Sequence, residues 1–213
     1  MNTISVGECL KFGWESFKKR ALFLVGLTLI IIAVSMASSY IFGNFSNGIL
    51  AFIGFLASLS VSILLDMGVT AFVLKYHDNV DAPKYSDLWH PQPFLYYAGA
   101  TVLSALMVMI GLVLLVVPGI IFALSLMFVK FVVIERGLAP IEAMKESARI
   151  AKGHRWELLI LLLAIIAINV IGAIPFGLGL LVTIPVSALA VAHKYRSLVH
   201  GAGEMTPATA KVA

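Results

Sequence analysis

Two oppositely charged residues, Asp66 and Lys130, lie inside long apolar stretches of the sequence, where charge is otherwise rare. Asp66 stands eight residues before Leu74, which places it about 12 Å from the nearer end of its helix at ~1.5 Å per residue. A charged side chain at the centre of a membrane helix costs roughly 2.5–3.5 kcal/mol. We therefore expect Asp66 to face other helices and to find a partner there, or to be protonated.

A row of small and hydroxylated residues accompanies Asp66 on the same helix. The row repeats every four residues and consists of Gly54, Ser58, Ser62, Asp66 and Thr70. Such residues let membrane helices approach closely and hydrogen-bond across the contact. Gly179, Thr183 and Ser187 repeat the pattern nearer the C-terminus. We expect both segments to lie at helix contacts, and contact with each other is one such arrangement.

Lys130 is the natural counter-charge for Asp66. It stands four residues before Ile134, the end of its apolar stretch. Its stem can therefore reach inward to Asp66 or extend to the membrane surface. One interpretation is an intramembrane cation or proton site formed by Asp66, Lys130, Ser62 and Thr70. The alternative is a structural ion pair, which we favour because a transporter usually carries more than one intramembrane acid.

The composition places much of the chain in lipid. The sequence is 61% hydrophobic and 12% charged, whereas soluble domains carry about 25% charged residues. The formal net charge is +4 without a long basic run, which suits anionic lipid headgroups better than nucleic acid. The single cysteine, Cys9, excludes an internal disulfide and a cysteine metal cluster. We expect Cys9 to be a small buried residue.

The apolar segments predict an all-α membrane protein with six transmembrane helices arranged as three hairpins, since each span needs about 20 apolar residues. The predicted spans are 21–42, 49–74, 94–117, 119–134, 156–174 and 176–193. Together they make a membrane domain over 21–200. An amphipathic cytoplasmic helix over 1–20 precedes it, and a flexible cytoplasmic tail over 201–213 follows it.

All fifteen Lys and Arg residues fall on one side of this predicted topology. The three connections on the other side, 43–48, 118–119 and 174–177, carry no charge. By the positive-inside rule, we expect an inner-membrane protein with both ends of the chain on the cytoplasmic side. Pro185 lies inside the sixth span and is expected to kink it.

The cytoplasmic side is predicted to contact lipid headgroups. Amphipathic helices are expected there before the first and third hairpins, the second of them starting at Pro140, and both should lie in the interface plane. Basic residues cluster next to the first, fifth and sixth spans. This predicted rim consists of Lys18, Lys19, Arg20, Arg155, Lys194 and Arg196. The expected partners are therefore anionic membrane lipids, while a homo-oligomer or a membrane-protein partner remains open.

No pattern in the sequence predicts catalysis. The five histidines do not pair with one another or with a carboxylate at metal-binding spacing on one helix. Phosphate-binding glycine loops, zinc-protease motifs and nucleophile–histidine–acid orders are also missing from the sequence. We therefore expect no enzymatic activity, no cofactor and no metal site.

Several segments resemble a known group of bacterial proteins. The resemblance rests on residues 13–20, 111–120, 142–153 and 179–185, and on the closing pair Tyr195-Arg196. The sequence is similar to six-helix membrane proteins of unknown function that include the membrane domain fused to some glycerophosphoryl diester phosphodiesterases. The resemblance implies a bacterial inner-membrane protein and supplies no activity, because the soluble phosphodiesterase domain is missing from this sequence.

These features favour a non-enzymatic membrane protein with a structural, lipid-contacting or accessory role at the cytoplasmic leaflet. The alternative is a small transporter or channel that uses the Asp66–Lys130 site. A membrane-embedded enzyme acting on lipid ranks third, because it would need clustered acids or histidines.

Overall fold

The computed structural model describes residues 5–43, 48–78 and 94–203, and every described secondary-structure element is a helix. The all-α prediction is confirmed for these residues. The predicted tail lies largely outside them, as do Lys84 and His90 in the polar stretch before the second hairpin.

Nine helices make up the described part of the chain. They are α1 (Val6–Lys19), α2 (Ala21–Gly43), α3 (Gly48–Asp78), α4 (Phe94–Leu114), α5 (Val116–Ser125), α6 (Val129–Arg136), α7 (Pro140–Ala151), α8 (Arg155–Ala173) and α9 (Leu180–Gly203). Consecutive helices pack as pairs: α2 with α3, α4 with α5, and α8 with α9.

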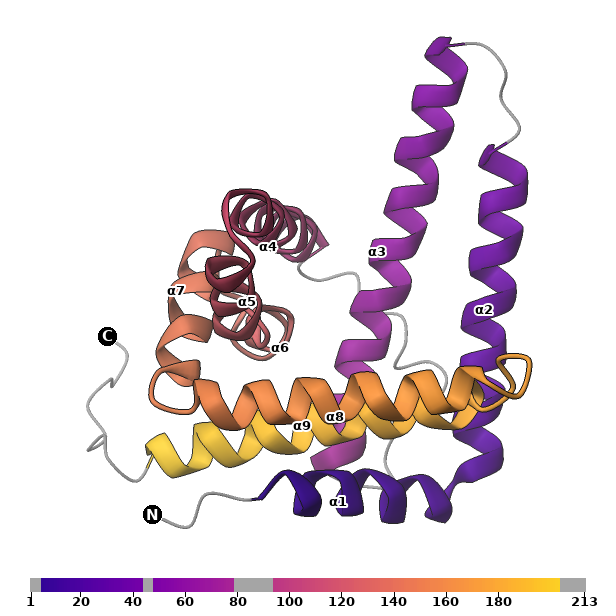
Figure 1. The fold of residues 1–213 in the computed structure, drawn as a ribbon. Coiled ribbons are helices and arrows are strands. Elements are labelled where there is room, and N and C mark those ends of the chain that lie inside the picture. Colours follow the sequence, from indigo (N-terminus) through magenta and orange to yellow (C-terminus); the bar gives the residue numbers. More distant parts are fainter. Residues whose placement is uncertain (1–4, 44–47, 79–93, 204–213) are drawn as a thin grey trace, which may run out of the picture.

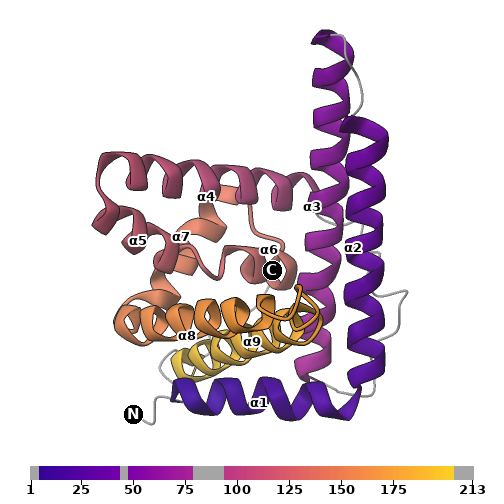
Figure 2. The same ribbon diagram turned by 45° about the vertical axis from the view of Figure 1, so that its right-hand side comes forward.

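The three helix pairs point in different directions. Figure 1 shows α2 and α3 standing upright while α8 and α9 lie across their lower part. Figure 2 shows α4 and α5 extending to the left, away from α3. Three pairs arranged in this way cannot all stand normal to one flat bilayer, so the predicted parallel six-span arrangement is not confirmed.

In the described part of the chain, five helical segments are long and apolar enough to cross a membrane. They are Ala21–Phe42, Gly48–Asp78, Phe94–Leu114, Val116–Arg136 and Arg155–Ala173. They overlap the first five predicted spans, and the chain is an integral membrane protein with several spans. The sixth span stays a prediction, because α9 begins only at Leu180 and becomes polar from His193 onward.

The fourth predicted span, 119–134, is not one helix. Residues 126–128 form a turn that separates α5 from α6. Ser147 of α7 bridges this break, since its hydroxyl donates to the Ser125 carbonyl at 2.8 Å and accepts from the Phe128 N–H at 3.2 Å. Its hydroxyl thus satisfies backbone groups that an interrupted helix would leave unpaired away from water.

The two amphipathic helices bury their apolar faces in the protein. α1 begins at a capping box between Ser5 and Glu8, and it packs along α9 with Cys9 and Gly13 buried in the contact. α7 buries Ala143 among other residues against its neighbours. This differs from the expected placement in the membrane surface, because neighbouring helices, and α9 above all for α1, already offer an apolar partner.

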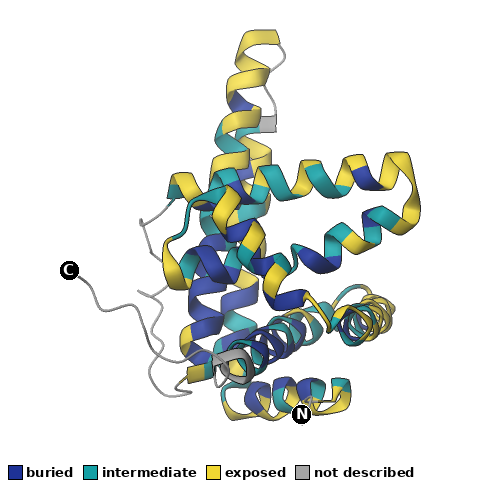
Figure 3. Cartoon of the chain, turned by 90° about the vertical axis from the view of Figure 1, so that its left-hand side faces the viewer, coloured by how far each residue is buried: buried dark blue, intermediate teal, exposed yellow. Residues whose placement is uncertain are grey.

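Burial changes along α3 from one end to the other (Figure 3). Its first turns expose Ile49, Phe52 and Phe55, whereas its last turns enclose Phe72 and Tyr76 completely. The packed core therefore lies around the C-terminal part of α3, where α4, α6 and α9 meet it.

Candidate functional site

The structure brings Asp66 and Lys130 together. The Lys130 Nζ atom lies 2.7 Å from Asp66 Oδ2, and the Tyr97 hydroxyl donates to the same oxygen at 2.7 Å. Helices α3, α6 and α4 supply these three side chains. The Asp66 and Lys130 side chains are 39% and 42% exposed, so the pair lies at the edge of the packed core.

Thr70 joins this cluster and Ser62 does not. The Thr70 hydroxyl lies 3.0 Å from the Tyr97 hydroxyl and donates at 2.8 Å to the carbonyl of Asp66, one turn earlier. Ser62 is exposed, and its hydroxyl donates to the Ser58 carbonyl at 3.0 Å. Residues four apart drift by about 40° around a helix, which turns Ser62 away from the side where Tyr97 lies.

Tyr97 is the member of this cluster that sequence reasoning missed. It follows Tyr96 near the start of an apolar helix, a position typical of an interfacial aromatic belt. Only the packing distinguishes the two tyrosines, because Tyr97 is completely buried and Tyr96 is exposed. Nothing in the sequence alone separates them.

The arrangement around Asp66 suits a structural ion pair. Lys130 and Tyr97 both bond one carboxylate oxygen, which provides the hydrogen bonds that an ion pair away from water requires. A transport path would also need access for a cation or a proton. The partial exposure of both charged side chains leaves that access open, so the geometry is compatible with either interpretation.

A second charged cluster joins α3, α6 and α9. This junction cluster consists of Asp78, Glu135, Tyr195 and Arg196. Arg196 Nη2 lies 2.5 Å from Asp78 Oδ2, and the same guanidinium pairs with Glu135. The Tyr195 hydroxyl donates to Glu135. Burial, followed by this bond, raises the pKa of Tyr195, so its hydroxyl stays protonated as a donor.

Two members of the predicted lipid-facing rim lie inside the protein. Lys194 is 1% exposed and its Nζ atom lies 2.6 Å from Glu157 Oε2. Arg196 belongs to the junction cluster and is also largely enclosed. The rim prediction is wrong for both residues, because carboxylates from neighbouring helices already hold their charges.

The other four predicted rim residues remain nearer the surface. Lys18, Lys19 and Arg155 are exposed, and Arg20 is half-buried. The Lys18 ammonium lies 5.9 Å from the centre of the Trp14 ring. The charged surface available to lipid is therefore smaller than the sequence predicts.

His77 and His193 lie together although 116 residues separate them. His77 Nε2 is 3.0 Å from His193 Nδ1, and the Phe12 ring stacks on His193 with centroids 4.1 Å apart. Helices α3, α9 and α1 thus meet at these three rings. The described residues hold no group of three or more His, Cys, Asp or Glu side chains that could bind a metal ion.

Glu146 of α7 holds the two arginines nearest to it. Arg136 Nη1 lies 2.5 Å and Arg149 Nη2 2.7 Å from Glu146 Oε1. The hydrogen bond from Arg149, together with the charges of both arginines, lowers the pKa of Glu146. Glu146 therefore stays ionised at neutral pH and links α7 to α6.

The second row of small residues packs against α8 and not against α3. A Cβ atom on Gly172 would lie 2.8 Å from Thr183 Oγ1, and one on Gly179 would lie 2.5 Å from the Gly172 carbonyl oxygen. The Asn169 amide donates to Ser187 at 3.2 Å. α9 meets α3 instead at its charged end, through the histidines and the junction cluster.

Part of the chain is similar to a described family. Residues 96–201 match the DUF975 family. The description of that family is "Protein of unknown function", so the match supplies no activity. The matched region contains Tyr97, Lys130, Ser147 and the whole junction cluster except Asp78.

Distant relatives extend the similarity to most of the chain. Uncharacterised proteins of Mycobacterium bovis and Mycobacterium tuberculosis are 23% identical over 226 aligned residues, which cover 92% of this chain and 69% of each relative. No solved structure matches the chain significantly. These matches give no activity, and the link to the phosphodiesterase-fused domain stays a prediction.

Proposed function

We propose that the chain is a non-enzymatic membrane protein that contacts anionic lipid headgroups at the cytoplasmic leaflet of a bacterial inner membrane. The observation that carries this proposal is the pairing of exposed cations with exposed tryptophans. Lys18 lies near Trp14 on α1, and Arg155 directly precedes Trp156 on α8. Tryptophan prefers the membrane–water interface, and Lys or Arg beside it can reach the headgroups.

The proposed orientation puts both chain ends on the cytoplasmic side. It follows from the positive-inside rule, since the uncharged turns then face outward. Labelling of single cysteines in a Cys9→Ser background tests it. A cysteine replacing Lys152 should be reached only after the cells are opened, whereas labelling of intact cells at that position would refute the orientation.

Retention of lipid by the purified protein tests the headgroup contact. The protein is taken from bilayer discs that contain equal phosphatidylglycerol and phosphatidylcholine, and the bound lipids are counted by native mass spectrometry. One exposed cation attracts an anionic surface by about 1 kcal/mol, which corresponds to about fivefold. The Lys18→Gln/Lys19→Gln variant should therefore lose much of its preference for phosphatidylglycerol. An unchanged preference would exclude these cations from the function.

A second candidate function, transport through the Asp66–Lys130 pair, is supported by the partial exposure of both side chains. Proton and cation flux into liposomes distinguishes it from the structural role. If the protein transports protons or cations, Asp66→Asn should abolish the flux. The matched variant Asp78→Asn in the junction cluster should leave the flux unchanged. We expect no flux above that of empty liposomes, because Lys130 and Tyr97 already occupy the carboxylate.

A further inference from the structure

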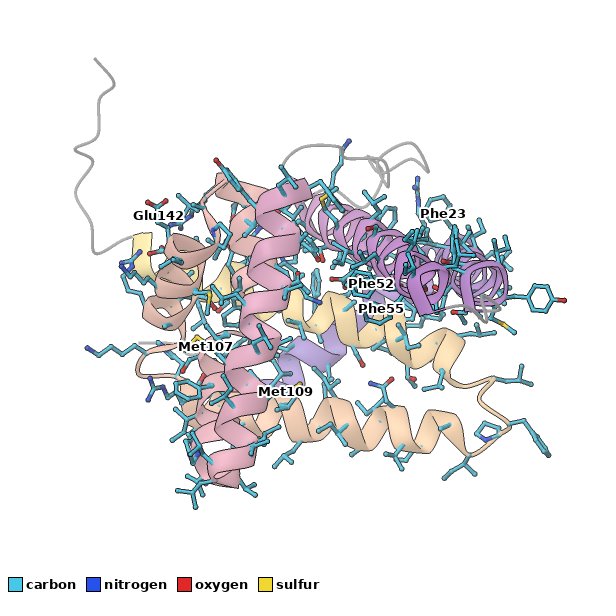
Figure 4. All side chains as sticks on the ribbon, turned by 90° about the horizontal axis from the view of Figure 1, so that it is seen from above. Phe23, Phe52, Phe55, Met107, Met109 and Glu142 are labelled. Carbon is cyan, nitrogen blue, oxygen red and sulfur yellow. The ribbon has the colours of Figure 1, made fainter. Side chains whose placement is uncertain are left out.

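An apolar groove of about 400 Å³ lies between α4, α5 and α7. Its apolar walls are formed by Leu103, Met107, Ile121, Phe122, Met144 and Ala148. Figure 4 shows Met107 on the side of α4 that faces α7, with Met109 on the opposite side. The volume falls in the ~300–1,000 Å³ range of small-molecule sites.

Two cations line this otherwise apolar groove. They are Lys145 of α7 and Arg155 at the start of α8. Neither forms an ion pair with another residue in the described part of the chain. The nearest following acids in the sequence, Glu146 and Glu157, already form ion pairs. Glu146 pairs with two arginines, and Glu157 pairs with Lys194. Nearly all of the groove surface is apolar, so these two residues line it with their carbon stems. Their charged ends have no carboxylate partner in the described part of the chain.

Ser125 lies beside the groove at the end of α5, next to the helix break. The residue is 5% exposed, and its hydroxyl is buried without a hydrogen-bond partner among the described residues, although its carbonyl accepts from Ser147. The groove surface beside this residue is therefore apolar.

Trp156 places this groove at the level of the headgroups. It follows Arg155 directly and is 74% exposed. Tryptophan concentrates where hydrocarbon meets the headgroup layer. An acyl chain entering from the bilayer would therefore find the two cations at the depth of its own phosphate.

We propose that this groove binds one acyl chain of an anionic phospholipid drawn from the surrounding bilayer. Lys145 and Arg155 bind the phosphate, and the apolar walls hold the acyl chain. No acid is among the lining residues to pair with the cationic group of a zwitterionic lipid, so the groove selects for net negative charge. The inference rests on the proposed function and adds a specific site to it.

The lipid-retention assay described above tests the site directly. Lys145→Gln/Arg155→Gln should lower retention of one phosphatidylglycerol molecule by about fivefold per cation, or about 30-fold for both. Ala148→Phe should also lower it, because the larger ring fills the groove without changing any charge. The matched control, Lys18→Gln/Lys19→Gln, should keep this one tightly held molecule.

Each contrary outcome overturns the proposal in a different way. Unchanged retention in both groove variants would show that the groove is not the site, even if the Lys18/Lys19 variant loses its general lipid preference and the proposed function stands. Equal retention of phosphatidylcholine would refute the selection for negative charge. Displacement of the lipid by inorganic phosphate alone would refute the role of the acyl chain. Loss only in the Lys18→Gln/Lys19→Gln variant would assign the binding to α1 and not to the groove.

Discussion

Charged and apolar side chains are distributed differently in two regions of the molecule. One is the region where α3, α6, α8 and α9 meet, called the junction here, and the other is the far ends of the helix pairs. At the junction, charged side chains from α3, α6, α8 and α9 hold one another in ion pairs. At the far ends, called the tips here, the exposed residues are apolar. The tips comprise residues 40–42 with 48–50, 113–117 and 174–178.

This difference indicates the surroundings that suit each region. Soluble proteins rarely leave such large apolar patches bare, so the exposed apolar surface near the tips suits a membrane environment. Charges away from water need partners, and the junction supplies them within the protein. The stability of the fold should therefore depend on the junction, and the tips should contribute little to it.

The largest effect is expected from removing a carboxylate partner of Lys194. Glu157→Leu takes away the carboxylate that lies 2.6 Å from an ammonium only 1% exposed. Breaking a buried ion pair on one side costs about 3–5 kcal/mol, and the lower end applies here because Glu157 itself is a third exposed. Equilibrium unfolding in mixed detergent measures the loss.

The double variant Glu157→Leu/Lys194→Met distinguishes the charge from the packing. It should be more stable than Glu157→Leu alone, because no buried charge is left without its carboxylate. Equal losses of unfolding free energy in the two variants would show that the Glu157–Lys194 ion pair does not stabilise the junction.

A smaller loss is expected from the helix break. Ser147→Ala leaves the Ser125 carbonyl and the Phe128 N–H without the hydroxyl that bonds both. Unsatisfied buried groups cost about 1–3 kcal/mol. The matched control is Ser38→Ala, since the Ser38 hydroxyl is buried without a partner and should cost little to remove. Equal losses in the two variants would show that the bridge does not stabilise the break.

This break also shows how far the sequence predicts the fold. Hydrophobic length alone predicts the helical spans, because each needs a long apolar run. The turn at 126–128 has no proline or glycine to mark it. The Ser147 hydroxyl that bridges this turn lies 22 residues from Ser125, so only tertiary packing brings the two residues together. The directions of the helix pairs are likewise set by packing and not by hydropathy.

The candidate site was predictable only in part for the same reason. An acid and a base inside apolar stretches each need a partner, which the sequence predicts. In the structure, Asp66 and Lys130 pair with each other. Tyr97 and the two buried rim residues depend on which side of a helix meets its neighbour. A basic residue near the end of a span has the same sequence signature whether it is exposed, as Arg155 is, or buried in the protein, as Lys194 is.

The contact between α1 and α9 gives a further test of the junction. A Cβ atom on Gly13 would lie 2.6 Å from the Val186 carbonyl oxygen, so Gly13→Ala must push α1 away from α9. Overpacking of this kind costs about 1–3 kcal/mol. Gly7→Ala on the same helix is the control, because the nearest atom is 3.9 Å away. It should gain up to about 1 kcal/mol from helix propensity. A stable Gly13→Ala protein would mean that this close approach is dispensable.

The smallest effect is expected at a tip. Leu114 ends α4 and is 72% exposed, so Leu114→Ala removes few contacts within the protein. Its unfolding free energy in detergent should stay within about 0.5 kcal/mol of the wild-type value. The same change in a packed core would cost about 2–5 kcal/mol. A loss of that size at Leu114 would mean that the tip packs against protein, either another part of this chain or a second copy, and the contrast between tips and junction would no longer hold.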